Sequence, residues 1–454
     1  MNRQLVAARI DPFIQWLVML GFLTLPYTHL KWMPDLGLTR PVSIVFFALA
    51  FGLVGLQALL ANRLNLRAWL AWPVSWDNWP MLRWWLGLMG LGLLSAALTP
   101  FYGLPREAFT RLLGYVAIFI TLFMGAYSLP RYGMPRVARW IVWGYLPVMV
   151  YALVEIVAIF KQPEAIQWIQ WFRATFLVPF SWASRLSLLA TEPSFVGFQI
   201  LLLALILPYV TPKWLKWCGW ALVLVCLIFT LSGTAVGLIA IYAGLWLLFS
   251  FSRRVLARLV WVTAGAGGLA LWAVWWAPLA RQAADHLTTT IFAVERMKDM
   301  SISFQIRFYY VMNLVYAMLE SRGLGLGIGQ YGYFWREIYL RNIDYTRFDL
   351  YGEVHRALTV PGDYVKPWSV ILGVGVDLGL LGLALLVGFF IQVYRQLAAP
   401  RHRAMFLACL VGLMGAYPIV TPHLWLALAL MAGAGAVARL EPAHLPTQSG
   451  KEPL

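Results

Sequence analysis

The chain has 454 residues, of which 61% are hydrophobic and only 12% are charged, and its mean hydropathy is +0.72. Soluble domains carry about 25% charged residues, so this composition excludes an ordinary soluble protein and indicates a polytopic α-helical membrane protein. The net charge of +16 would suggest a nucleic-acid partner in a soluble protein, but membrane proteins place Lys and Arg in short cytoplasmic loops. We therefore expect membrane lipids around the chain and no nucleic acid.

Continuous apolar runs predict an all-α fold of about twelve membrane-spanning helices, since about 20 apolar residues cross a bilayer. The first run follows a basic N-terminus without a cleavage motif, so we expect it to remain as an anchor. The expected spans cover residues 12–30, 41–61, 80–99, 108–128, 139–160, 187–209, 214–231, 233–250, 257–278, 368–393, 403–419 and 422–438.

These runs divide the chain into four regions. Residues 1–278 carry the first nine spans and include an outer segment, 161–184, whose apolar residues recur at helical spacing and predict an amphipathic helix at the membrane surface. Residues 279–367 form one large loop, 368–440 carry the last three spans, and 441–454 form a polar tail.

Basic residues mark every second connection, and these connections hold almost no acidic residues. By the positive-inside rule they lie in the cytoplasm, which puts both termini there and the 279–367 loop on the opposite face. In a bacterium that face is the periplasmic side of the inner membrane. The marking residues are Arg3, Arg9, Arg63, Arg67, Arg131, Arg136, Arg139, Lys213, Lys216, Arg253, Arg254, Arg258, Arg395, Arg401 and Arg403.

The large loop interrupts the apolar pattern most strongly, since residues 281–366 hold nine of the 19 acidic residues. Within it, Ser301–Glu320 predicts a helix with Arg307 in its first turns, beside Tyr309 and Tyr310. Helix N-terminal amides and a guanidinium together bind phosphate oxygens, so Arg307 is a candidate anion-binding residue. The alternative is an arginine that extends to solvent.

A glycine run, Gly323-Leu-Gly-Leu-Gly-Ile-Gly329, follows Arg322 at the end of this predicted helix. Gly323 suits the position that ends a helix. The other glycines would either aim backbone N–H groups at a phosphate or form a flexible return loop.

Aromatic and acidic residues are interspersed from Tyr331 to Trp368. This mixture suits sugar rings, which offer apolar C–H faces and many hydroxyl groups. We therefore predict a glycan-binding region that includes Tyr331 and Trp335, with Tyr309 and Tyr310 from the preceding helix.

The span after the amphipathic segment opens with Arg185 and carries Glu192, followed by a proline, about two turns further on. A carboxylate at that depth costs several kcal/mol unless it faces water or a cation. Glu192 either pairs with Arg185 to fix the helix or lies in a water-filled cavity and takes a proton from a hydroxyl, and the second reading is preferred. Glu155 and Asp377, near the outer ends of their spans, are expected to be cavity residues or interior ion-pair partners.

Taken in order, these elements resemble the O-antigen polymerase and O-antigen ligase superfamily, whose polytopic enzymes use polyprenyl-diphosphate-linked glycans. The resemblance covers roughly residues 185–382. Its elements are Arg185…Glu192-Pro-Ser at the start of a span, the Leu231-Ser-Gly-Thr234 turn, Arg307, the glycine run, and Asp377-Leu-Gly-Leu-Leu-Gly382 in the span that closes the large loop.

The resemblance implies a fold similar to C-type glycosyltransferases and an inverting glycosyl transfer that uses no metal and no cofactor. It implies that Arg185 and Arg307 hold the donor diphosphate, and Arg322 is a third candidate for that role. The proton-accepting base is left open between Glu192, which is preferred, and His355, whose alternative is a solvated loop position.

Ligases of this superfamily carry a His-Asn pair just before the closing span, but Val365–Ser369 contain no histidine here, which favours a polymerase. The predicted function is therefore the joining of undecaprenyl-diphosphate-linked oligosaccharide repeat units, with a chain-length regulator protein as a candidate partner. The alternatives are an O-antigen ligase that transfers glycan to lipid A-core and a transporter of lipid-linked glycan. The scarcity of charged residues within the spans argues against the transporter.

Overall fold

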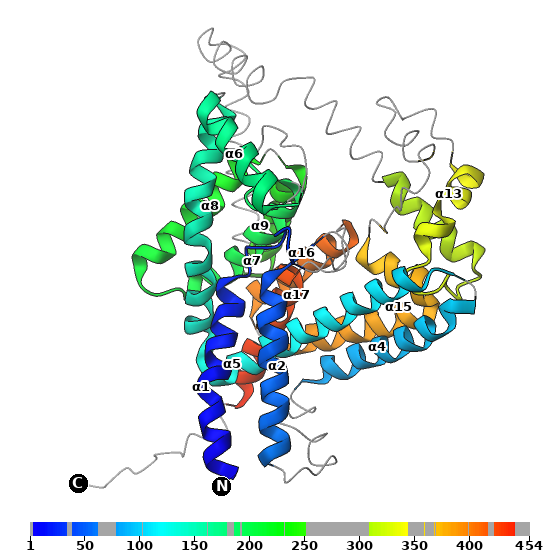
Figure 1. Ribbon diagram of the computed structural model, residues 1–454, viewed down its shortest axis with the longest axis horizontal. Helices are drawn as coiled ribbons and strands as arrows, with labels where there is room; N and C mark the ends of the chain where they lie inside the picture. The colour runs from blue at the N-terminus through cyan, green and yellow to red at the C-terminus, as the bar shows by residue number, and fades with distance from the viewer. Residues whose placement is uncertain are drawn as a thin grey trace.

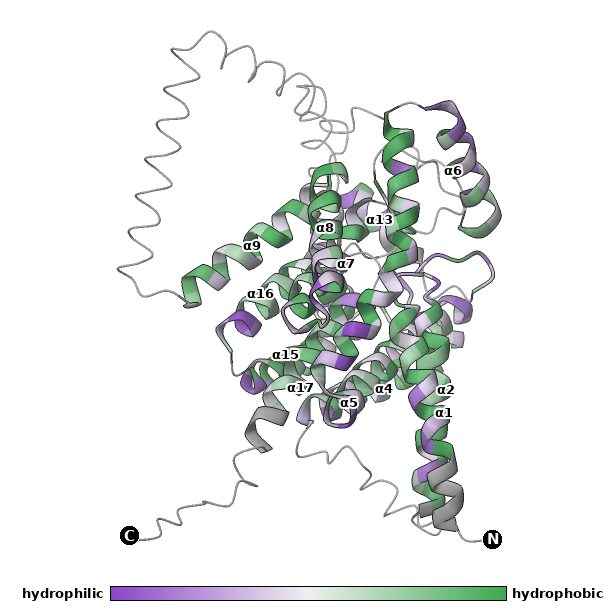
Figure 2. Ribbon diagram, turned by 90° about the vertical axis from the view of Figure 1, so that its left-hand side faces the viewer, coloured by the Kyte–Doolittle hydropathy of each residue, from purple (hydrophilic) through white to green (hydrophobic). Residues whose placement is uncertain are grey.

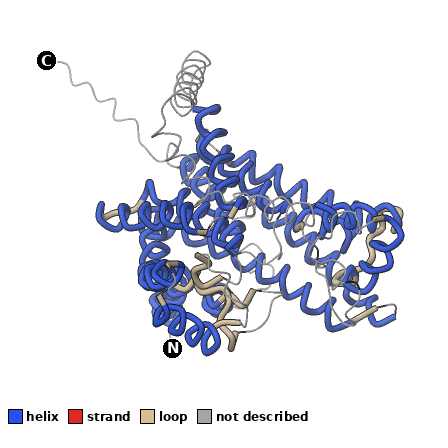
Figure 3. The backbone as a smooth tube through the Cα atoms, turned by 90° about the horizontal axis from the view of Figure 1, so that it is seen from above, coloured by secondary structure: helices blue, strands red, loops and turns tan. Residues whose placement is uncertain are grey.

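The computed structural model of the protein describes residues 3–33, 39–61, 79–101, 103–160, 162–178, 186–190, 193–230, 232–250, 308–343, 358, 367, 369–397, 399–415 and 422–440. Within these residues the secondary structure is helical (Figure 3). The described part contains no strand, only two isolated bridges, His29 with Arg40 and Leu30 with Leu177. The predicted all-α class is therefore confirmed.

The helices follow the predicted spans. Each predicted span overlaps an apolar helix except 257–278, which lies outside the described residues. In chain order the helices are α1 (Arg3–Leu23), α2 (Val42–Ala61), α4 (Pro80–Leu98), α5 (Pro105–Ile159), α6 (Pro163–Phe176), α7 (Pro193–Ile206), α8 (Lys213–Phe229), α9 (Gly233–Ser250), α13 (Tyr331–Asn342), α15 (Val370–Gln396), α16 (Pro400–Gly415) and α17 (Pro422–Leu440). Residues 308–320 form a further helix, and the 3-10 turns η1 (Thr99–Phe101) and η2 (Leu207–Tyr209) extend α4 and α7.

Five of the described helices, α2, α4, α5, α9 and α15, are long and apolar enough to cross a membrane. Shorter apolar stretches lie in α1, α7 and α17. Hydrophobic residues predominate along the described helices (Figure 2). Many large hydrophobic side chains are exposed, and Leu94 on α4 and Leu224 on α8 are each 60% exposed. Because lipid solvates such a surface and water does not, the structure supports a membrane-embedded helical protein. The number of crossings stays a prediction.

The helix α5 combines two predicted spans, 108–128 and 139–160, around a bend at Gly133. Gly133 has φ 72° and ψ 153°, and Pro130 and Pro135 flank it. Glycine adopts a positive φ without steric cost and proline removes a helical hydrogen bond, so this short sequence bends the helix. The two halves of α5 therefore run in different directions (Figure 1).

An aromatic cluster joins four helices at the centre of the core. Trp85 of α4 donates its Nε1–H to the Tyr115 carbonyl of α5 at 3.0 Å. The Trp85 ring centroid lies 5.3 Å from that of Phe389 on α15 and 4.9 Å from that of Trp425 on α17. Edge-to-face pairs of this kind add to the stability gained by burial. The cluster thus fixes α4, the first half of α5, α15 and α17 against one another.

Connections predicted to share one side of the membrane contact each other. On the side predicted to be periplasmic, Lys31 Nζ donates to the Ala174 carbonyl in α6 at 3.1 Å. On the same predicted side, the Leu104 N–H donates to Gln330 Oε1 at 2.6 Å and Gln330 Nε2 donates to the Leu104 carbonyl at 3.0 Å. The large loop is therefore tied to the connection between α4 and α5.

The connections predicted to be cytoplasmic form a second set of contacts. Asp11 of α1 pairs with Arg131 at the bend of α5, with 2.7 Å between Oδ1 and Nη1. Tyr209 in η2 contacts His402 Nε2 through its hydroxyl at 3.1 Å. This grouping agrees with the predicted alternation, but which group faces the periplasm stays a prediction.

Candidate functional site

Four of the predicted site residues, Arg185, Glu192, Arg307 and His355, lie outside the described residues. Their assigned roles therefore stay predictions. The structure does describe the turn 186–190 between Arg185 and Glu192, the chain from Pro193 onward, and the helix 308–320 that follows Arg307. One buried ion pair holds the turn at 186–190, and a second holds Gly329, which lies beyond that helix.

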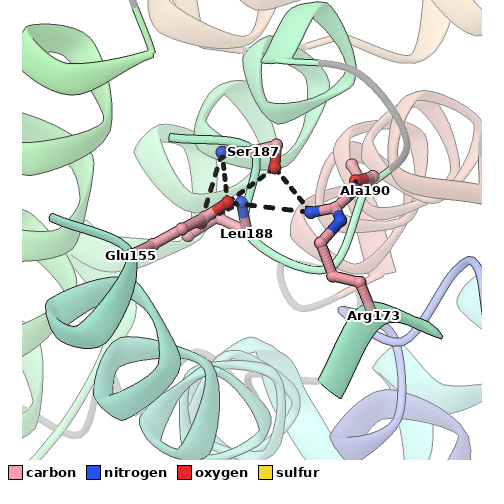
Figure 4. A network of polar contacts seen from close by, with 5 residues as sticks. All are labelled: Glu155, Arg173, Ser187, Leu188 and Ala190. Atoms are coloured by element: carbon pink, nitrogen blue, oxygen red, sulfur yellow. Dashed lines mark hydrogen bonds and ion pairs between the residues drawn. The ribbon is translucent and has the colours of Figure 1, made fainter. Parts of the chain in front are cut away.

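The first ion pair holds the turn at 186–190 (Figure 4). Glu155, near the end of α5, is completely buried. Its carboxylate accepts the backbone N–H of Ser187 at 3.2 Å and of Leu188 at 2.9 Å, and it accepts the Ser187 hydroxyl at 2.7 Å. A carboxylate buried at this depth is tolerated because these donors replace its water.

Arg173 of α6 completes the network. Its Nη1 lies 3.7 Å from Glu155 Oε1 and donates to Ser187 Oγ at 2.8 Å, while Nη2 donates to the Ala190 carbonyl at 3.0 Å. Leu188 has φ 52°, a left-handed conformation that a non-glycine residue keeps only where its surroundings fix it. The turn between Arg185 and Glu192 is thus held firmly to α5 and α6.

Glu155 was expected to be an interior ion-pair partner or a cavity residue, and it is the former. Its partner Arg173 was not predicted. A signal was present, because α6 buries Ile169 and Arg173, four residues apart, on the same face. The helix α6 lies within the predicted amphipathic segment 161–184, and its place at the outer surface of the membrane stays a prediction.

The second ion pair holds the glycine run. Asp377 of α15 is buried, and its Oδ2 lies 2.7 Å from Nε of Arg111, which stands in the first turns of α5. The other oxygen, Oδ1, accepts the backbone N–H of Gly329 at 3.1 Å. Asp377 is therefore also an interior ion-pair partner, as one of its two predicted roles required.

The glycine run docks on α15 at a bend in that helix. Gly379 at the bend has φ 69°, and a Cβ on it would lie 2.5 Å from the carbonyl oxygens of Gly323 and Leu324. The Leu380 N–H donates to the Gly323 carbonyl at 2.8 Å, and the Leu326 N–H donates to the Val376 carbonyl at 2.7 Å. Only glycine allows two backbones to approach this closely.

The run is therefore neither of the two predicted alternatives. Its glycines do adopt positive φ, from 72° at Gly329 to 97° at Gly327. However, the N–H groups of Gly325, Ile328 and Gly329 bond to Ser321 Oγ, Ser95 Oγ and Asp377 respectively. These three N–H groups hold the glycine run against neighbouring side chains. The predictions that they bind phosphate or belong to a flexible loop were therefore both wrong for them.

Three of the four residues predicted to contact glycan are buried. Tyr310, Tyr331 and Trp335 are at most 6% exposed, and with Tyr339 they form the core between the 308–320 helix and α13. The Trp335 ring centroid lies 6.3 Å from that of Tyr310 and 6.1 Å from that of Tyr339. In this arrangement they pack the loop rather than offer a face to a sugar, which corrects the prediction for them.

Other aromatic residues of this region are accessible. Tyr309 is partly buried, so its predicted glycan contact stays open. Tyr333 on α13 is 61% exposed and was not predicted. Pattern alone could not separate the two groups, since an aromatic residue suits a sugar-binding surface and a small core equally well.

Arg322 lies exposed at the start of the glycine run, with φ 51°. In Figure 1 the 308–343 region and α13 lie at the right, whereas α6 lies at the upper left and α7 left of centre. The described residues next to Arg185 and next to Arg307 thus lie in different parts of the structure. The placement of the two arginines relative to each other stays a prediction.

Within the described ranges, no three His, Cys, Asp or Glu side chains are arranged to hold a metal ion. No protein-family model matches the chain, and no curated protein shows significant sequence similarity to it. The chemical assignment therefore depends on the residues themselves.

Proposed function

We propose that the protein is an O-antigen-type polysaccharide polymerase of the bacterial inner membrane. It transfers a growing glycan from undecaprenyl diphosphate to the terminal sugar of a new lipid-linked repeat unit at the periplasmic face. The transfer inverts the anomeric centre and uses no metal. A lipid diphosphate is already a good leaving group, so positioning and charge neutralisation suffice for catalysis.

One observation carries the proposal. Two buried carboxylates of the described residues, Glu155 and Asp377, accept backbone N–H groups from segments that follow predicted diphosphate-binding arginines, two groups for Glu155 and one for Asp377. Glu155 holds Ser187 and Leu188, which follow Arg185. Asp377 holds Gly329, at the end of the run that follows the helix after Arg307. A substrate-binding arginine needs such rigid support for its backbone, because loose positioning costs rate.

The proposed roles follow from charge. Arg185 and Arg307 bind diphosphate oxygens and neutralise the charge that develops as the bond between the anomeric carbon and the diphosphate breaks. The electron pair of that bond leaves with the diphosphate. The acceptor hydroxyl forms the new bond to the anomeric carbon and gives up its proton to a base, for which Glu192 is the first candidate and His355 the second.

Deletion of the gene tests the function. Loss of a polymerase should leave single repeat units in a ladder gel of cell-surface glycan. Loss of a ligase should instead leave polymer on its lipid carrier and none on lipid A-core. A deletion strain with an unchanged ladder would refute the proposal.

Substitution of the two arginines tests the mechanism. Arg185→Ala and Arg307→Ala, each expressed in the deletion strain, should abolish polymer while the protein stays in the membrane at its normal amount. Arg336→Ala is the matched control, because Arg336 is an exposed arginine of the same loop on α13. It should restore the full ladder. Polymer of normal length from Arg185→Ala or Arg307→Ala would contradict the assigned roles.

A further inference from the structure

The second half of α5 and the helix α8 lie side by side and run in the same direction. Near the start of both, the ring centroids of Trp143 and Trp214 lie 5.5 Å apart, with the rings edge to face. At their far ends, the centroids of Phe160 and Phe229 lie 6.2 Å apart in a similar arrangement. Contacts at both ends fix the two helices as a parallel pair, which begins on the side predicted to be cytoplasmic.

A patch of basic residues lies where this pair begins. Arg139 precedes Trp143 by about one helical turn and Arg136 precedes it by about two, while Lys213 is the first residue of α8. All three basic side chains are exposed. Arg139 Nη2 donates to Thr211 Oγ1, two residues before α8, at 3.0 Å. This hydrogen bond joins the basic residues of α5 to those of α8, so they form one patch.

The basic patch has no acidic counterpart. Neither residues 129–143 nor residues 211–217 contain an Asp or Glu. None of the ion pairs between described residues involves Arg136, Arg139 or Lys213. The nearby Arg131, in contrast, pairs with Asp11. The patch therefore carries an uncompensated positive charge, which attracts an anion.

Three indole rings show the depth of the patch in the membrane. Trp143, Trp214 and Trp217 are all exposed, and they lie on the same helical turns as the basic residues or next to them. Indole rings concentrate at the headgroup level of a bilayer, where the ring contacts lipid and the N–H contacts water. The patch thus lies at the level of the lipid phosphates.

Exposed apolar side chains continue from the patch along both helices. On α5, Trp143, Val150 and Val157 are spaced seven residues apart and lie on one face of the helix, and on α8 Trp217 and Leu224 have the same spacing. The row on α5 rises about 21 Å, whereas the hydrocarbon of one leaflet is about 15 Å deep. Either row is therefore a surface for an acyl chain.

We propose that this patch binds one anionic phospholipid of the cytoplasmic leaflet. Its phosphate lies between Arg139 and Lys213, with Arg136 adding charge, and its acyl chains lie along the exposed rows of α5 and α8. A guanidinium and an ammonium both bind phosphate oxygens, and basic pockets between membrane helices recognise anionic headgroups. The bound lipid bridges α8 to the part of α5 that follows Gly133. This site is separate from the proposed glycosyl transfer and does not depend on it.

Native mass spectrometry of the detergent-purified protein with added phosphatidylglycerol tests the site. Arg139→Gln should weaken binding about fivefold, because one basic residue near an anionic lipid contributes about that factor. Adding Lys213→Gln should bring the loss to at least about tenfold. Phosphatidylcholine, which has no net charge, should bind the unaltered protein more weakly and lose little in the double variant. Since both side chains are exposed, the melting temperature of the double variant without lipid should stay normal.

The matched control is Arg403→Gln, because Arg403 is an exposed arginine on α16 on the same predicted side. It should keep the affinity of the unaltered protein. An equal loss in Arg403→Gln would show a general charge effect, and equal affinity for phosphatidylcholine would show that charge is not recognised. Either result overturns the proposal, and so does full displacement of the lipid by inorganic phosphate, which would show a site for soluble anions.

A phosphatidylglycerol with a photoreactive headgroup locates the site on the unaltered protein. Cross-linked peptides should come from residues 136–143 and 211–217. Cross-links spread evenly over the connections predicted to be cytoplasmic would refute a defined site. This measurement needs no substitution, so it tests the proposal even if the double variant does not accumulate.

Discussion

Among the described residues, the buried carboxylates Glu155 and Asp377 each pair with an arginine and accept further hydrogen bonds. The pairs are Glu155 with Arg173 and Asp377 with Arg111, and the carboxylate also accepts the backbone N–H groups of Ser187 and Leu188 in the first and of Gly329 in the second. Removing one partner of such a pair leaves an uncompensated charge, which costs about 3–5 kcal/mol.

The first pair gives a prediction at this scale. Arg173→Gln should lower the melting temperature of the detergent-purified protein strongly, because Glu155 then stays buried without its cation. The double variant Glu155→Gln with Arg173→Gln should recover part of the loss, since no net charge is buried. Thermal unfolding of the two single variants and the double variant measures the coupling. Strictly additive effects would show that the two side chains act independently.

The sequence pattern could not provide these pairings. Charged residues are scarce within the predicted spans, so Glu155 and Asp377 stand out there. The spacing of the apolar residues of α6 places Arg173 on the buried face of that helix. However, Arg111 and Asp377 are 266 positions apart, and nothing in the local pattern links them. Their pairing depends on how the helices pack.

At the scale of elements, glycine positions determine how the large loop meets the membrane helices. The run from Gly323 to Gly329 and the bend at Gly379 form one contact, because each backbone approaches the other too closely for a side chain. The run was recognised in the sequence, but its role was misread, because the receiving glycine lies in another helix. The positions of the membrane-spanning helices, in contrast, could be predicted, because the length of each apolar run is enough to indicate a span.

Substitution of Gly379 tests this contact. Gly379→Ala places a Cβ 2.5 Å from two carbonyl oxygens at a positive φ, so we expect a loss of at least about 1–3 kcal/mol of stability. The control Gly237→Ala, on α9, meets no atom within 4 Å and should be neutral or slightly stabilising. The amount of protein in the membrane and its melting temperature measure both effects. Equal stability of the two variants would contradict the docking described above.

At the scale of the whole molecule, single-cysteine variants can test on which side of the membrane each connection between helices lies. Gln170 on α6 and Arg336 on α13 are exposed and belong to the predicted periplasmic groups, whereas Lys216 on α8 belongs to the cytoplasmic one. In a background without native cysteines, Gln170→Cys and Arg336→Cys should react with an impermeant maleimide in spheroplasts. Lys216→Cys should react only after the membrane is opened. Labelling of Gln170→Cys and Arg336→Cys from opposite sides would refute the topology.

The bend of α5 has a mechanical consequence for the proposed transfer. Arg111 before the bend and Glu155 after it belong to one continuous helix, so the angle at Gly133 sets how far apart their two anchored segments lie. Neither ion pair crosses the bend, so a different angle at Gly133 would move the turn at 186–190 relative to Gly329 and leave both pairs intact. The bend therefore helps to set the spacing of the segments that follow the arginines proposed to bind the donor diphosphate.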